Sequence, residues 1–203
     1  MMDDALAQTF AQTLATTVRA ALDRLDEVRL PLHILLDARF GELNENQEEL
    51  LGAARDAADA IDGALRQLAE IADAARGALP VRREAVHVND VVRAVLPLAQ
   101  AAAARRGARA AASLDPMLPR VSADRARLAE ALALLAEGAA AHADAGATLS
   151  IETGRDADGV WLSVAPAPRP DVPSAAAVLA ASLVEAQRAR IEWTAEGVRV
   201  RFA

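Results

Sequence analysis

Three histidines, His33, His87 and His142, are the side chains best able to carry acid–base or phosphoryl-transfer chemistry in this sequence. They lie far apart along the chain, so no two of them have the close spacing of metal ligands. Cysteine and lysine are both absent, which removes thiolate ligands, cysteine nucleophiles and lysine Schiff bases. We therefore expect no metal site, and no catalytic residue of these kinds.

His33 is the histidine with the most suggestive neighbours. It follows Asp26 by about two helical turns, so both side chains would lie on nearly the same face of a helix. Asp37, one turn later, could orient the imidazole ring. Two interpretations stay open for His33: a phosphoacceptor, or an ordinary solvated histidine on a helix. Asp26 is a poor aspartyl phosphoacceptor, because such sites need a carboxylate cluster and a lysine.

The elements that must position these residues are helices. Residues 1–79 contain one proline, Pro31, and their apolar residues recur every three or four positions. The pattern predicts a first helix to Phe40, with Gly41 as its C-cap, and a second helix that starts at the capping-box pair Asn44 and Gln47. Such a hairpin has a single apolar seam. We expect it to pair with a second copy as a dimeric four-helix bundle, the alternative being a hairpin packed only on the C-terminal half of its own chain.

After a Gly–Pro–basic stretch, with a linker expected at residues 80–84, the pattern changes to alternating strands and helices over residues 85–203. The fold class is therefore α+β, a long helical hairpin followed by a two-layer α/β sandwich. Trp161 and Trp193 fall in strands and are expected in the core. The predicted elements are strands at 86–88, 109–114, 148–153, 160–165, 191–194 and 198–202, and helices at 89–104, 123–142 and 174–188.

Two segments resemble bacterial sensor histidine kinases. Asp26-Glu27-Val28-Arg29-Leu30-Pro31-Leu32 is similar to the H-E-L-R-T-P-L box of that family, midway along the first helix of its dimerisation hairpin. The run from Asp124 to Leu132 is similar to the D-x-x-R-L-x-Q-x-L segment before the family's N box. The resemblance implies a dimerisation hairpin followed by a GHKL (Bergerat) ATP-binding domain.

The positions that carry the family's chemistry are replaced. The phosphorylated histidine is Asp26, the following phosphatase threonine is Leu30, and the two N-box asparagines correspond to Leu134 and Gly138. The glycine-rich loop expected after the strand at 160–165 is an Ala/Pro segment, and only about eight residues remain for a nucleotide lid. We therefore expect no ATP, and no other cofactor, in a Bergerat-like domain whose lid is missing.

The resulting prediction is a catalytically inactive, histidine-kinase-like dimer that acts as a scaffold or regulator in two-component signalling. Its partner would be a response-regulator receiver domain or a partner kinase. Two other functions stay open: a phosphotransferase that relays phosphate through His33 without ATP, and a kinase of unusual chemistry, which the missing residues argue against. The resemblance places the partner-binding residues on the flank of the bundle, at Leu30, His33, Asp37 and Phe40.

Net charge and hydropathy indicate where the protein acts. The formal net charge of −7 argues against binding nucleic acid, which needs a basic face. The acidic N-terminus lacks the features of a signal peptide, and no apolar run is long enough to span a bilayer. We expect a cytoplasmic protein that binds neither nucleic acid nor membrane.

Overall fold

The computed structural model describes residues 2–37, 41–166, 175–194 and 196–202, with side chains from residue 8 onward. Its chain forms two compact units, Met1–Ala78 and Leu79–Ala203. Among the described residues, no helix combines the length and the apolar character needed to cross a membrane.

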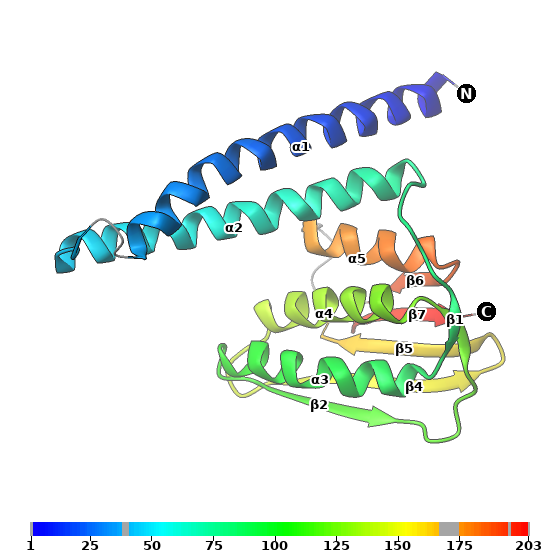
Figure 1. The fold of residues 1–203 in the computed structure, drawn as a ribbon. Helices are drawn as coiled ribbons and strands as arrows, with labels where there is room; N and C mark the ends of the chain where they lie inside the picture. Colours follow the sequence, from blue (N-terminus) through cyan, green and yellow to red (C-terminus); the bar gives the residue numbers. More distant parts are fainter. Residues whose placement is uncertain (1, 38–40, 167–174, 195, 203) are drawn as a thin grey trace. The chain divides into compact units, whose positions relative to one another are not determined.

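The N-terminal unit is a hairpin of two long helices, α1 (Met2–Leu36) and α2 (Glu45–Ala75), which pack along each other (Figure 1). Their contact is narrow, because most of the side chains buried in it are alanines. The fully buried residues of this seam are Ala11, Ala15, Val18, Ala58 and Ala72. A seam of such small side chains excludes little apolar surface from water, and it leaves larger apolar residues of both helices exposed.

The start of α2 follows from local sequence. The Asn44 side chain accepts a hydrogen bond from the Gln47 backbone N–H, and the Gln47 side chain accepts one from the Asn44 N–H, each at 3.0 Å. This confirms the predicted capping box. Helix α1 continues through Pro31 and ends at Leu36, before the expected end at Phe40. Phe40 lies outside the described residues.

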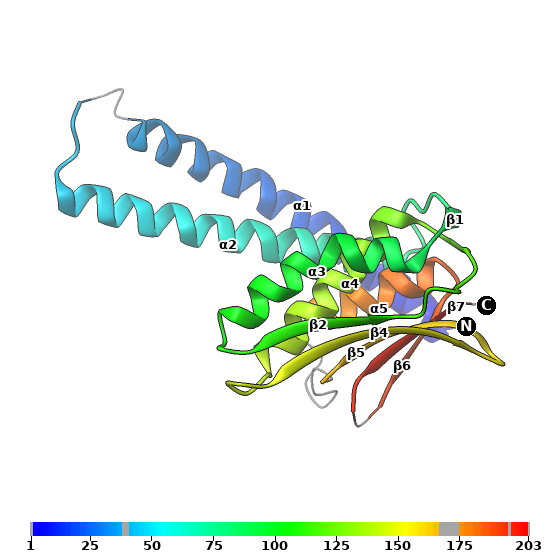
Figure 2. The same ribbon diagram turned by 90° about the horizontal axis from the view of Figure 1, so that it is seen from below.

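The C-terminal unit has two layers. A five-stranded mixed sheet, with strand order β2-β4-β5-β7-β6, carries the three helices on one face (Figure 2). Strands β2 and β4 run parallel and the other neighbours antiparallel, while β1 and β3 form a separate antiparallel pair. The elements are β1 (Glu84–Val86), α3 (Val88–Ala104), β2 (Arg109–Leu114), β3 (Val121–Ala123), α4 (Arg125–Ala141), β4 (Thr148–Asp156), β5 (Gly159–Ala165), α5 (Ala175–Ala186), β6 (Arg190–Trp193) and β7 (Val198–Phe202).

The core of this unit lies between the helices and the sheet. Strand residues that face the helices alternate with exposed or half-buried ones, as the period of a strand requires. The largest fully buried side chains from the two layers are Leu128, Leu132, Leu135, Leu149, Ile151, Leu162, Leu179 and Leu183. The sequence therefore indicated the two-layer architecture correctly.

The start of this unit differs from the prediction. The first strand is Glu84–Val86 and not 86–88, so that the last residue of the expected linker, Glu84, belongs to β1. Helix α3 begins at Val88, one residue before the predicted start, and His87 is its N-cap residue. The buried Asn89 side chain donates to the carbonyl of Asp115 at 2.7 Å, and its side-chain oxygen accepts from the Thr153 hydroxyl at 2.8 Å. These distant partners could not be read from the local sequence.

The structure also contains a strand that was not predicted, β3, and it places both tryptophans outside the buried core. Strand β3 has three residues, too few to produce an alternating pattern, and it exists through its pairing with β1. Trp161 is half-buried on the sheet face opposite the helices, where its ring covers Gly154 and the Arg199 guanidinium lies 4.7 Å from its centroid. Trp193 is half-buried on edge strand β6. Neither side chain is part of the buried core.

Candidate functional site

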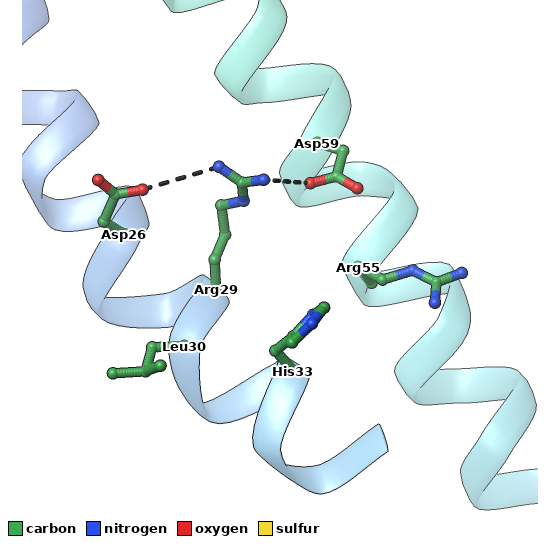
Figure 3. Close-up of a pocket in the computed structure, with 6 residues that line it drawn as sticks. All are labelled: Asp26, Arg29, Leu30, His33, Arg55 and Asp59. Atoms are coloured by element: carbon green, nitrogen blue, oxygen red, sulfur yellow. Dashed lines mark ion pairs between the residues drawn. The ribbon is translucent and has the colours of Figure 1, made fainter. Parts of the chain in front are cut away.

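The segment that resembles the histidine-kinase box lies in the second half of α1. Asp26, Leu30 and His33 project from successive turns of this helix, and α2 contributes Arg55 and Asp59 to the same region (Figure 3). Together with Arg29 these residues line an open hollow of about 440 Å³, which we call the groove. The groove therefore unites two of the predicted partner-binding residues, Leu30 and His33, with Asp26, which the resemblance aligns with the phosphohistidine.

Arg29 holds the two helices together beside the groove. Its guanidinium lies 2.9 Å from a carboxylate oxygen of Asp59 and 3.4 Å from one of Asp62, both on α2, and 3.7 Å from Asp26 on its own helix. Arg66 completes the cluster by bonding to Asp62 at 2.8 Å. That hydrogen bond and the positive charges of Arg66 and Arg29 together lower the pKa of the Asp62 carboxyl. The ion pairs of Arg29 thus link α1 to α2 at the edge of the groove.

Leu30 is the exposed apolar residue of the groove. Its side chain is 64% exposed and points away from α2. The other predicted partner-binding residues are less informative. Asp37 directly follows α1 and its N–H bonds to the His33 carbonyl at 3.0 Å, whereas Phe40 lies outside the described residues. Asp37 does not line the groove.

The remaining exposed apolar residues of the hairpin lie on its other side. At about 100° per residue, Phe10 and Val28 share one direction on α1, and Leu30 lies about 160° away from them. On α2, Leu50 and Ile61 lie to one side of the buried seam and Arg55 and Asp59 to the other. The hairpin therefore has a groove side and an apolar side, the latter formed by Phe10, Val28, Leu35, Leu50 and Ile61.

The sequence analysis did not identify Arg55 and Asp59 as residues of the site. Each is an ordinary charged residue within a helix that carries many of them, and its role depends on the register between α1 and α2. The sequence offered one signal: α2 is rich in aspartates, and the histidine-kinase-like segment of α1 contains an arginine. This signal could not have identified which aspartate meets Arg29.

The second region of interest is the place of the N-box residues on α4. Leu134 and Gly138 are half-buried on this helix, which packs against both α3 and α5. Neither side chain has an oxygen or nitrogen that could hold a metal ion or a phosphate. The segment that would replace the glycine-rich loop and the lid falls largely in residues 167–174, outside the described residues. Among the described residues, no group of three or more His, Asp or Glu could hold a metal ion.

The arrangement of a helical hairpin followed by a mixed sheet with three helices on one face is histidine-kinase-like, and solved structures show the same fold. Full-length ShkA, solved in complex with AMPPNP, superposes with a TM-score of 0.70 at 22% identity, over 95% of this chain and 46% of the ShkA chain. The Acinetobacter baumannii histidine kinase AdeS gives a TM-score of 0.63 at 14% identity, over 90% of this chain and 96% of its own. The chain thus spans about half the length of ShkA. No protein-family model and no curated protein matches the sequence.

Proposed function

We propose that this protein is a catalytically inactive, histidine-kinase-like component of two-component signalling, a dimeric scaffold or regulator that binds a receiver domain. The observation that carries the proposal is the groove. A leucine stands exposed beside the position of the family's phosphohistidine, and it lies on the opposite side of the hairpin from the other exposed apolar residues. A partner kinase is the alternative occupant of the same surface.

The proposed inactivity rests on four residues. The Asp26 carboxylate cannot form a phosphoimidazole, Leu30 replaces the phosphatase threonine, and Leu134 and Gly138 offer no ligands to magnesium or phosphate. We therefore expect isothermal titration calorimetry with Mg-ATP to give no binding heat at ligand concentrations up to the millimolar range. Micromolar affinity for the nucleotide would contradict this part of the proposal.

The apolar side of the hairpin supports the proposed dimer. Its five exposed residues form a stripe along both helices, and apolar stripes of this length on soluble proteins mark interaction surfaces. A second copy of the hairpin would cover the stripe and complete a four-helix bundle.

A matched pair of variants separates the two sides. Val28 is 54% exposed on the apolar side and Leu30 is 64% exposed on the groove side, so that neither substitution disturbs the buried seam. Val28→Asp places a charge in the proposed dimer interface, and light scattering should then give the monomer mass of 21.2 kDa. Leu30→Asp should keep twice that mass and an unchanged melting temperature.

Leu30→Asp should also weaken binding to the cognate receiver domain at least about tenfold, because truncation of a central apolar anchor costs about 2 kcal/mol. Biolayer interferometry with receiver domains from the same genome measures this affinity. Equal affinities of the native protein and Leu30→Asp would place the partner surface elsewhere. A melting temperature lowered by many degrees would assign Leu30 to the folded core instead.

A phosphotransferase acting through His33 is the second candidate function. It is favoured by one observation: His33 lines the groove together with Arg29 and Arg55, and guanidinium groups suit the binding of phosphate. Incubation with a phosphorylated receiver domain tests it. Label transferred to the native protein but not to His33→Ala would establish the relay, and absence of label on the native protein would exclude it.

A further inference from the structure

The charged residues of the hairpin are distributed as unevenly as the apolar ones. On the apolar side, the positions of α2 between Leu50 and Ile61 are mostly alanine, and on α1 Arg24 lies one turn before Val28. On the groove side, carboxylates outnumber guanidinium groups. The acidic residues there are Asp23, Asp26, Asp37, Glu48, Asp59, Asp62 and Asp73, and the basic ones are Arg19, Arg29, Arg55 and Arg66.

The four arginines of the groove side are already paired, Arg19 with Asp73 at 3.0 Å. Arg29 bonds to Asp26, Asp59 and Asp62, and Arg66 bonds to Asp62. Arg55 is paired with Asp56, the next residue along α2, at 3.2 Å. The charge that the groove side offers to a partner is therefore negative, because its cations are paired and its carboxylates outnumber them.

Among the described residues, Leu30 is the large apolar side chain that is exposed within this acidic surface. The neighbouring Asp26 side chain is 67% exposed, and that of Asp59 is 50% exposed. A binding surface complementary to this pattern needs an apolar hollow for Leu30, with basic side chains on the rim beside the two aspartates.

We propose that the groove side binds a receiver domain whose docking surface is basic, and that Asp26 is a specificity residue for this partner. The inference rests on the proposed function and adds the chemistry that selects one receiver over others. At the position where the resembling family has its phosphorylated histidine, Asp26 presents a carboxylate to the lysine or arginine side chains of the partner.

Two neighbouring residues supply a matched test. Asp26→Asn and Glu27→Gln each remove one negative charge from side chains of similar exposure, 67% and 64%, but Glu27 does not line the groove. Asp26→Asn leaves the 2.9 Å pair between Arg29 and Asp59 in place, so the hairpin should stay folded. Circular dichroism checks this for both variants.

Affinities for a panel of receiver domains from the same genome are measured by biolayer interferometry at low and high salt. For the basic receiver that binds the native protein, Asp26→Asn should weaken binding about three- to tenfold, mainly through slower association. Glu27→Gln should bind like the native protein. Raising the salt from about 50 to 300 mM should weaken native binding by a similar factor, since exposed charges are screened.

The outcomes distinguish this inference from the proposed function. Loss of binding in Leu30→Asp, together with native affinity in Asp26→Asn and no salt dependence, would overturn the inference and keep the function. Preference for receivers with acidic docking surfaces would also overturn it. Native binding in Leu30→Asp would refute the proposed function and the inference with it.

Discussion

Arg29 joins the two helices of the hairpin at a point where little apolar surface is buried. Its guanidinium is shared among three carboxylates, two of which belong to the other helix. Single exposed ion pairs contribute little to stability, but a network that crosses between helices restricts their register. The register in turn determines which residues of α2 meet Leu30 and His33.

Arg29→Ala should therefore destabilise the hairpin by about 1 kcal/mol, because Asp59 and Asp62 lose their shared cation. Arg24→Ala is the control, since Arg24 pairs with Glu27 within its own helix and both side chains are largely exposed. It should change the free energy of unfolding by no more than about 0.5 kcal/mol. Urea unfolding followed by circular dichroism, at one protein concentration, measures both. Equal effects of the two substitutions would show that the cross-helix network adds nothing.

Asp62 makes the stability of the hairpin depend on pH. Its hydrogen bond with Arg66 lowers the pKa of the folded carboxyl, so the unfolded chain takes up its proton at a higher pH than the folded chain does. The contribution of Asp62 is complete above the unfolded value of about 3.9 and is lost as the pH falls through the lower folded value. Between pH 5 and pH 2, the native protein should lose stability more steeply than Asp62→Asn. Parallel profiles would contradict this assignment.

At the scale of elements, Asp124 organises the start of α4 and its neighbours. Its carboxylate accepts hydrogen bonds from the backbone N–H groups of Ala126, Arg127 and Arg82, while its own N–H donates to the buried Gln187 side chain. Burial acts to raise the pKa of Asp124, but the three backbone hydrogen bonds outweigh it and the pKa is lowered. One side chain thus caps α4 and ties it to the segment before β1.

Asp124→Ala should destabilise the C-terminal unit by about 1–2 kcal/mol, the usual cost of losing an N-cap carboxylate. Asp90→Ala is a suitable control, because Asp90 lies in the first turn of α3 and bonds only to the exposed Arg93 among the described contacts. Both tryptophans of the chain lie in this unit, so tryptophan fluorescence reports its unfolding apart from the hairpin. A similar loss in the two variants would count against a special role of Asp124.

The elements show how far local sequence reaches. The capping box at Asn44 and the strands β4 and β5 are confirmed, since each depends on residues close in sequence. The β1–β3 pair and the buried Asn89–Thr153 hydrogen bond join residues far apart along the chain. No local pattern encodes such contacts. The groove also joins residues far apart along the chain. The sequence therefore indicated its α1 residues but not Arg55 and Asp59 on α2.

At the scale of the whole molecule, the hairpin combines two surfaces of opposite character on one pair of helices. The apolar side suits association with an identical surface, because the exposed apolar side chains of two copies would cover one another there. An acidic side with a single leucine suits a different partner. The periodicity of the sequence predicted the helices and the seam, but it could not assign each exposed leucine to a side before the register of the hairpin was known.

The hydrogen bond from the Arg82 N–H to Asp124 has a practical consequence for cutting the protein into parts. The composition of the sequence suggests separating the domains after residue 84, yet Arg82 supplies a partner to a largely buried carboxylate and Glu84 is the first residue of β1. A fragment that starts at residue 85 would leave that carboxylate one donor short and would shorten its first strand. A fragment that starts at Leu79 keeps both, and it is the one to express for crystallisation or NMR.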